Sequence, residues 1–217
     1  MKKYDVVLFD LDGTLTDPGI GITNSVAYAL RKFEIDVPDR TELYKFIGPP
    51  LLDSFRDFYG FAEEESRLAL KYYREYFAET GIFENDLYPG VPEMLERLKA
   101  AGIQVGLATS KPEPYARRIL DHFSLSRYFD SVTGASMDEV LSRKPDIIAL
   151  ALKKHTFQDL SKVIMVGDRE HDVLGASENN IQTIGVLYGY GSETELHDAG
   201  AAKLAEKPND ILKICLS

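Results

Sequence analysis

Short apolar segments alternate with helix-length amphipathic segments from residue 88 onward, and this alternation restricts the fold more than any other feature of the chain. Such alternation is typical of a parallel sheet covered by helices on both faces. The predicted strands lie near 103–108, 129–133, 162–166, 181–186 and 203–205. The helices predicted between and after them are 92–101, 112–122, 145–154, 170–179, 193–199 and a last one from 209.

A further apolar run, Val6-Val7-Leu8-Phe9, stands near the N-terminus and leads directly into Asp10-Leu11-Asp12-Gly13-Thr14. The run predicts a buried first strand. Ligands bind at the carboxyl ends of strands in parallel sheets. Two carboxylates at such an end repel each other unless a cation or a chemical task offsets their charge. We therefore predict an α/β fold with a Rossmann-like parallel sheet and a site at its carboxyl edge.

The segment between this first strand and residue 87 has a different pattern. Helical spacing of apolar residues covers 19–34, 51–60 and 62–79, and no strand is predicted among them. We therefore expect a small all-α domain, residues 16–86, inserted after the first strand. The α/β core then consists of residues 1–15 and 87–217.

Composition excludes several classes of protein. The chain has 217 residues, 44% of them hydrophobic, which supports a packed core, and its net charge is −10. An acidic surface argues against general binding to nucleic acid or to anionic membranes. The single cysteine, Cys215, allows no internal disulfide, and no apolar stretch reaches the roughly 20 residues that span a bilayer. With no signal sequence at Met1-Lys2-Lys3-Tyr4, we expect a cytoplasmic protein.

Polar residues gather where the predicted strands end. These residues are Asp10, Asp12, Thr109, Ser110, Lys111, Asp168 and Asp172, with Lys144 opening a helix. Oxygen ligands without zinc-like Cys or His spacing suit Mg²⁺, which readily shares its site with a phosphate. One carboxylate can attack phosphorus, and a second can protonate the leaving oxygen and later activate water. A lysine and a hydroxyl would offset charge on the phosphoryl oxygens.

In this order the residues resemble the four motifs of the haloacid dehalogenase-like hydrolase superfamily: Asp10-Leu11-Asp12-Gly13-Thr14, Thr109-Ser110, Lys144, and Gly167-Asp168 with Asp172. The resemblance covers almost the whole chain, and the helical segment 16–86 resembles the α-helical cap of that superfamily. Its dehalogenases lack the second acid of the first motif. Asp12 together with Asp168 therefore points to Mg²⁺-dependent phosphoryl chemistry.

The resemblance implies roles for the four acids. Asp10 matches the nucleophile, and Asp12 matches the general acid/base, whose backbone carbonyl also contacts the metal. Asp168 matches a direct Mg²⁺ ligand, and Asp172 matches a direct or water-mediated one. The implied metal-binding residues are thus Asp10, Asp12, Asp168 and Asp172.

The resemblance also implies a phosphate-binding set. Thr109 and Lys144 match the pair that holds the phosphoryl group during catalysis. Gly13 and Thr14 belong to the first motif and are expected beside the phosphate. Ser110 either binds phosphate or only caps the following helix, and both readings stay open.

Two further segments resemble the phosphoglycolate phosphatase-like branch of the superfamily, which includes bacterial 5′-nucleotidases. They are Thr109-Ser110-Lys111-Pro112 and Phe46-Ile47-Gly48-Pro49-Pro50-Leu51. Gly48 and Pro49 are expected in a cap loop that contacts the substrate, with a plain turn as the alternative. Lys111 is expected to meet a substrate carboxylate or a second phosphate, or to be solvated. The run Tyr188-Gly189-Tyr190-Gly191 predicts a loop whose glycines allow close approach to the core.

We therefore expect a Mg²⁺-dependent phosphatase of small phosphate monoesters, of the phosphoglycolate or nucleoside monophosphate class, acting through an aspartyl-phosphate. A β-phosphoglucomutase-like phosphomutase and a pyrophosphatase are alternatives, and a non-catalytic phosphate-binding regulator is a remote one. The expected partner is a small phosphorylated metabolite, with no nucleic acid and no membrane. A monomer and a homodimer are both compatible with the sequence.

Overall fold

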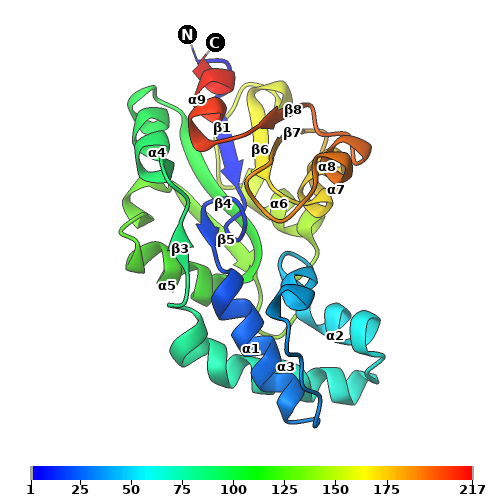
Figure 1. Cartoon of the computed structure of the whole chain (residues 1–217). Coiled ribbons are helices and arrows are strands. Elements are labelled where there is room, and N and C mark those ends of the chain that lie inside the picture. The colour runs from blue at the N-terminus through cyan, green and yellow to red at the C-terminus, as the bar shows by residue number, and fades with distance from the viewer. Residues whose placement is uncertain (1, 217) are drawn as a thin grey trace. The chain divides into compact units, whose positions relative to one another are not determined.

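The structure of the protein is a computed structural model that describes residues 2–216. The chain forms two compact units (Figure 1). Met1–Asp17 and Leu87–Ser217 make up the first, called here the α/β unit, and Pro18–Asp86 makes up the second, the helical unit.

The α/β unit is built on a six-stranded sheet in the order β5-β4-β1-β6-β7-β8, with every pairing parallel. Its strands are β1 (Val6–Phe9), β4 (Gln104–Pro112), β5 (Ser131–Ala135), β6 (Val163–Gly167), β7 (Gln182–Val186) and β8 (Lys203–Ala205). The four residues of β1 are completely buried, because the strand lies between β4 and β6 with helices on either side. The predicted parallel α/β sheet is confirmed.

Helices cover both faces of this sheet. They are α4 (Val91–Ala100), α5 (Glu113–His122), α6 (Lys144–Leu152), α7 (Glu170–Glu178), α8 (Glu193–Asp198) and α9 (Pro208–Leu216), with short 3₁₀ turns η3 (Ser126–Tyr128) and η4 (Leu160–Lys162). Helices α6 and α7 pack together on one face, and α4 and α9 pack together on the other (Figure 1). The right-handed connections of parallel strands produce this division.

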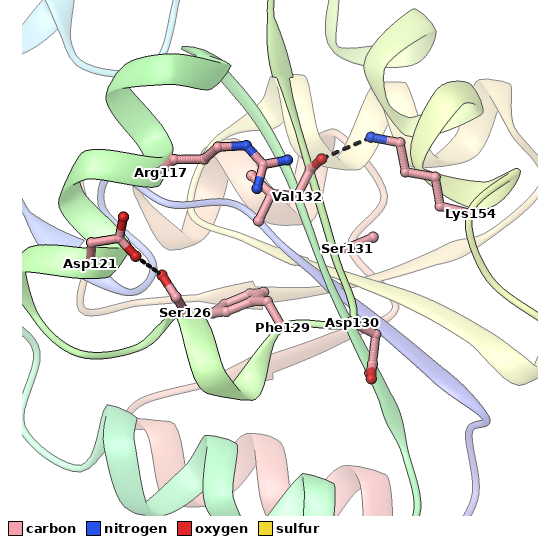
Figure 2. A pocket seen from close by; sticks show the side chains of 8 residues that line it. All are labelled: Arg117, Asp121, Ser126, Phe129, Asp130, Ser131, Val132 and Lys154. Atoms are coloured by element: carbon pink, nitrogen blue, oxygen red, sulfur yellow. Dashed lines mark hydrogen bonds between the residues drawn. The ribbon is translucent and has the colours of Figure 1, made fainter.

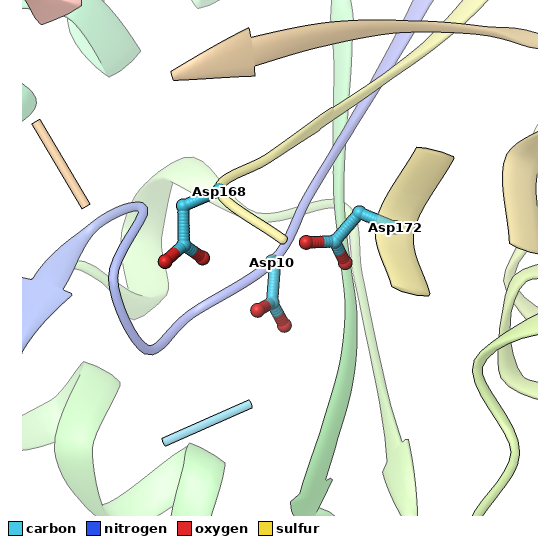
Figure 3. Close-up of side chains that lie close together, drawn as sticks. All are labelled: Asp10, Asp168 and Asp172. Carbon is cyan, nitrogen blue, oxygen red and sulfur yellow. The ribbon is translucent and has the colours of Figure 1, made fainter. Parts of the chain in front are cut away.

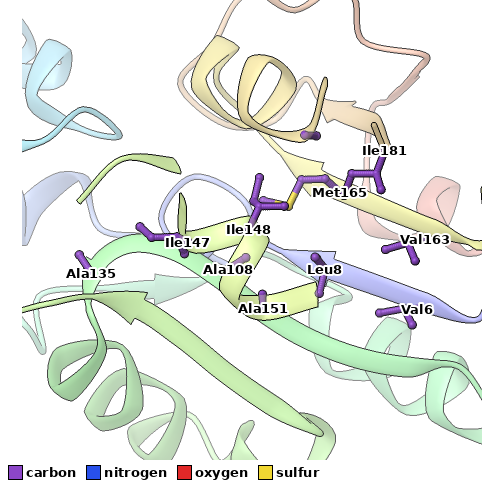
Figure 4. Packing of buried hydrophobic residues seen from close by; sticks show 11 residues of the cluster. Val6, Leu8, Ala108, Ala135, Ile147, Ile148, Ala151, Val163, Met165 and Ile181 are labelled. Carbon is purple, nitrogen blue, oxygen red and sulfur yellow. The ribbon is translucent and has the colours of Figure 1, made fainter. Parts of the chain in front are cut away.

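One apolar core cluster of the α/β unit lies between the sheet and helices α6 and α7. Leu8 of β1 and Met165 of β6 are fully buried there together with Ile147 and Ile148 of α6 (Figure 4). Ala176 of α7 is buried in the same cluster. Burial of this apolar surface is the main source of stability for the sheet. It holds the strands in register, so that their carboxyl ends meet at one edge.

The helical unit contains α1 (Gly19–Arg31), the 3₁₀ helix η1 (Arg40–Phe46), α2 (Leu51–Tyr59), α3 (Glu63–Tyr76) and a π-helical turn η2 (Phe77–Gly81). Aromatic side chains fill its interior, as in the pair Phe46 and Phe55, whose ring centroids are 5.1 Å apart. A β-carbon on Gly21 would lie 1.9 Å from the Gly81 carbonyl oxygen, so α1 can pack on this turn only with glycine there. The role of the helical unit as a cap stays a prediction.

Two short strands differ from the sequence expectation. Strands β2 (Thr16–Asp17) and β3 (Asp86–Leu87) pair with each other, whereas no strand is predicted between 16 and 86. Segments of two residues carry no hydrophobic period that could reveal them. In the part of the chain that the structure describes, no helix is both long and apolar enough to cross a membrane.

Candidate active site

The register of the central strands brings the predicted site residues to one edge of the sheet. Phe9 of β1 pairs with Leu107 of β4 and with Val166 of β6. The residues that follow each of these positions therefore leave the sheet side by side. Asp10 is held there by its backbone N–H, which donates to the carbonyl oxygen of Val166 at 2.9 Å. Asp168 follows directly after β6.

The turn after β1 lies directly on Asp168. Gly13 has a φ of 79°, a left-handed conformation that favours glycine, and a β-carbon there would lie 2.1 Å from Asp168 Oδ2. The hydroxyl of Thr14, fully buried, donates to Asp168 Oδ1 at 3.4 Å. In this structure Gly13 and Thr14 both lie against the Asp168 carboxylate. Their contact with phosphate stays a prediction.

Three buried carboxylates converge at this edge. Asp10, Asp168 and Asp172 each offer an oxygen atom, and these atoms lie within 4.8 Å of one another (Figure 3). Asp172 is in the first turn of α7, where its side chain accepts a hydrogen bond from the backbone N–H of Arg169 at 3.2 Å. The spacing from the end of β6 through the first turn of α7 thus brings two acids next to Asp10.

Lys144, the first residue of α6, joins two of these carboxylates. Its Nζ lies 2.8 Å from Asp10 Oδ1 and 2.8 Å from Asp172 Oδ1, and it also donates to the carbonyl of Ala108 at 3.3 Å. The side chain is 5% exposed. A buried ammonium shared by two carboxylates both fixes their orientation and reduces their repulsion.

Lys111 comes from an irregular stretch of β4. Thr109 pairs with Gly134 and Pro112 with the next residue of β5, so Ser110 and Lys111 form a bulge that β5 does not match. A bulge turns side chains in new directions. Here the Lys111 Nζ lies 2.8 Å from Asp12 Oδ2, with both side chains buried. Ser110 is half-buried beside it.

Burial and mutual repulsion shift the protonation of this cluster. Burial, and then the charges of Asp172 and Asp10, raise the pKa of Asp168 well above its ordinary value. Burial also raises the pKa of Asp172 against the opposing charge of Lys144, and that of Asp12 against the opposing charge of Lys111. Burial lowers the pKa of Lys144, but the neighbouring carboxylates outweigh this effect, so that its pKa is raised.

These observations fit a hard divalent cation. Three carboxylates with oxygens within 4.8 Å of one another, offset by the single ammonium of Lys144, form a centre of negative potential, which a cation would neutralise. The donors are oxygen atoms, as Mg²⁺ prefers. Asp12 Oδ1 is also buried without a hydrogen-bond partner among residues 2–216. Asp10, Asp168 and Asp172 are therefore the residues able to hold a metal, with Asp12 beside them.

Two predicted residues lie in the other unit. Gly48 and Pro49 belong to the helical unit, in the bend between η1 and α2, where Gly48 has a φ of 108°. Their contact with the substrate stays a prediction.

A cavity of about 510 Å³ at the β5 edge of the sheet contains none of the predicted site residues (Figure 2). Its Lys154 donates to the carbonyl of Val132, and its Asp121 accepts from Ser126 (Figure 2).

Sequence reasoning missed two residues at this edge: Tyr190, which holds Asp168, and Glu195, which holds the segment that follows Asp168. The backbone N–H of Tyr190 donates to Asp168 Oδ2 at 2.8 Å. Glu195 of α8 lies 2.8 Å from the Arg169 Nε and also accepts from the backbone N–H of Glu170 at 2.9 Å. No spacing signal reveals such contacts, although two glycines around Tyr190 indicate a close approach of the backbone.

Comparisons with known proteins agree with this geometry. The 5′-nucleotidase of Pseudomonas aeruginosa PAO1 is 46% identical over 194 residues, which cover 89% of this chain and 87% of that protein. The tyrosine-protein kinase PtkA of Mycobacterium tuberculosis H37Rv is 40% identical over 88% of this chain, and the chain spans 64% of that protein. The crystal structure of a predicted phosphatase from Clostridium acetobutylicum matches with a TM-score of 0.95 and 47% identity over 98% of both chains.

A family model described as haloacid dehalogenase-like hydrolase matches residues 7–186, a range that begins in β1 and ends with β7. It includes the whole helical unit and every one of the predicted site residues. The chain belongs to the haloacid dehalogenase-like hydrolase family.

Proposed function

We propose that the protein is a Mg²⁺-dependent phosphatase that hydrolyses small phosphate monoesters through an aspartyl-phosphate on Asp10. The observation that carries this proposal is the buried cluster of Asp10, Asp168 and Asp172, joined by Lys144, in a chain of a hydrolase family. Buried carboxylates without a task would cost stability, whereas a nucleophile and a metal site need them.

Asp10 performs the first step. One of its carboxylate oxygens forms a bond to phosphorus while the bond between phosphorus and the substrate oxygen breaks. Lys144 lies on Asp10 Oδ1 and holds the carboxylate in one orientation, which favours in-line attack by the other oxygen. When bound, Mg²⁺ would neutralise the three carboxylates and the phosphoryl oxygens, so that an anionic substrate can approach.

Asp12 acts as the general acid and then as the general base. It gives a proton to the departing alcohol oxygen and then takes one from the water that cleaves the bond between Asp10 and phosphorus. The second step releases phosphate and restores both aspartates. Burial raises the pKa of Asp12, which favours carrying this proton, whereas the Lys111 ammonium opposes the rise. The two effects together suit a group that must act as an acid and then as a base.

Other residues would bind the phosphoryl group and select the substrate. We assign Thr109 and Ser110 to the phosphoryl oxygens, because they follow Ala108 at the same sheet edge as Asp10. The helical unit would act as a cap that excludes water and selects the leaving group, with Gly48 and Pro49 in its contact loop.

For the substrate we propose nucleoside 5′-monophosphates ahead of phosphoglycolate. The support is the 46% identity, over most of both chains, to a protein named 5′-nucleotidase. A phosphomutase would use the same two aspartates but return the phosphoryl group to a sugar. A pyrophosphatase would cleave an anhydride at the same site.

The test is phosphate release with Mg²⁺ and with a chelator, from nucleoside monophosphates, phosphoglycolate, sugar phosphates and pyrophosphate. We expect release from one monoester class, only with metal, and a phosphoryl group on Asp10 in quenched samples by mass spectrometry. Asp10→Asn removes the nucleophile, and Asp198→Asn is the matched control on an exposed residue. Activity that survives in Asp10→Asn would overturn the mechanism. Silence on the panel combined with conversion of a sugar phosphate would instead identify a mutase.

A further inference from the structure

The loop after β7, Tyr188-Gly189-Tyr190-Gly191, is packed against the metal-binding edge by its backbone. A β-carbon on Gly189 would lie 2.4 Å from Asp168 Cβ and 2.4 Å from the Gly13 carbonyl oxygen. A β-carbon on Gly191 would lie 1.9 Å from the Asp168 carbonyl oxygen. Neither glycine has a positive φ, so the need for glycine here comes from space and not from backbone conformation.

This approach lets the loop bind both sides of Asp168. The backbone N–H of Tyr190 donates to Asp168 Oδ2 at 2.8 Å. Asp168 Oδ1 accepts from the hydroxyl of Thr14, and the hydroxyl of Tyr188 donates to the carbonyl of Thr14 at 3.0 Å. The loop therefore binds Asp168 Oδ2 directly. It also holds Thr14, whose hydroxyl donates to Asp168 Oδ1.

The two tyrosine side chains attach the loop to the segments where the chain leaves and re-enters the α/β unit. The hydroxyl of Tyr190 bonds to Asp17, the last residue of β2. The ring of Tyr188 packs edge-on against the ring of Tyr88, with centroids 4.8 Å apart. One four-residue loop thus joins Asp168 to both crossing points.

We infer that Tyr188–Gly191 is the positioning element of the metal-binding carboxylate Asp168, and that its two hydroxyl contacts set the affinity of the protein for Mg²⁺. This inference rests on the proposed function, since it assumes that Asp168 binds the metal. Groups that orient a metal ligand through hydrogen bonds commonly change metal affinity by roughly 10–100-fold when they are lost. The loop acts through Asp168 and does not itself touch the substrate.

The first variant is Gly189→Ala. Its methyl group would displace either the loop or Asp168, so we expect Mg²⁺ binding to weaken by roughly 10–100-fold. The readout is calorimetric titration of Mg²⁺ alone, without substrate. Circular dichroism and the thermal midpoint in chelator report whether the variant is folded.

The second variants remain informative if Gly189→Ala does not fold. Tyr188→Phe and Tyr190→Phe keep the rings and the backbone N–H but remove the hydroxyl contacts to Thr14 and Asp17. We expect Mg²⁺ affinity to fall several-fold in each. Tyr128→Phe is the matched control, because it removes a hydroxyl that accepts from Arg127 at 2.8 Å away from this edge.

The outcomes separate this inference from the proposed function. If the wild type does not bind Mg²⁺, the metal site of the proposed function fails. If the wild type binds Mg²⁺ and the two tyrosine variants bind it with wild-type affinity, the loop does not position Asp168 and the inference is overturned. A loss in Tyr188→Phe and Tyr190→Phe that Tyr128→Phe does not share supports it.

Discussion

Strands β1 and β6 bury apolar side chains along their length, whereas the residues just beyond their carboxyl ends bury charged ones. At Leu8 and Met165 they bury apolar side chains against α6 and α7. Two or three residues further along, at Asp10 and Asp168, the chain buries carboxylates instead. The first region stabilises the fold, whereas the second is electrostatically costly and is held in place by the first. Substitutions in the two regions should therefore separate stability from chemistry.

The largest expected effect is a loss of phosphate release with little change in the stability of the fold. Asp10→Asn removes the proposed nucleophile and nearly preserves its shape, so phosphate release should fall by at least about 10³-fold. The thermal midpoint in chelator should stay close to that of the wild type, because the substitution removes one negative charge from a crowded cluster. A large drop in the midpoint would show that the cluster stabilises the fold after all.

The next largest effect is a loss of folding stability with little change in turnover per folded molecule. Leu8→Ala leaves a cavity beneath the sheet, and the free energy of unfolding should fall by about 2–5 kcal/mol. Denaturant titration measures it, with Leu150→Ala, a residue 37% exposed on α6, as the control. Turnover per folded molecule should change little at low temperature. Equal losses in the two leucine variants would contradict the position assigned to the core.

A smaller effect is expected where the two roles meet, at the buried pair of Lys111 and Asp12. Lys111→Met should lower hydrolysis of alkyl phosphates by roughly 10–100-fold, because Asp12 loses the group that orients it. Aryl phosphates with good leaving groups need less help from a proton, so their loss should be smaller. Lys111→Arg should recover part of the rate, and Lys154→Met is the control. A uniform loss across leaving groups would instead assign Lys111 to substrate binding.

The smallest effect concerns protons. Folding raises the pKa of Asp168 and of Asp172, so their contribution to the stability of the metal-free protein is complete below the ordinary carboxyl pKa and is lost as the pH rises through the raised values. The proposed Mg²⁺ would bind the charged form. Burial raises the pKa of Asp172 to about 6, so Mg²⁺ binding should displace more of the Asp172 proton at about pH 5.5 than at about pH 8. Calorimetry in buffers of different ionisation enthalpy measures this release, and equal release at both pH values would contradict it.

Much of the α/β unit follows from local pattern. Strand β8 occupies Lys203–Ala205, the segment 203–205 that is predicted as a strand. Strand β6, Val163–Gly167, lies within one residue of the predicted 162–166, because its apolar run needs no long-range information to be recognised. The sequence predicts that strand β4 ends at 108, but the strand continues to Pro112. There the pairing with β5 resumes after the bulge, and pairing across strands leaves no mark on the spacing along one of them.

By itself, the sequence determined the parallel sheet and the order in which Asp10, Thr109, Lys144 and Asp168 follow its strands, because hydrophobic periodicity is a local property of the chain. Only the tertiary structure decided which of these groups touch. The pairing of Lys111 with Asp12 depends on a bulge in β4, and the bond from Tyr190 to Asp168 depends on a loop that follows β7. Contacts between residues 22 or 99 positions apart are set by strand register and by the space that glycines leave, and neither can be read from one segment alone.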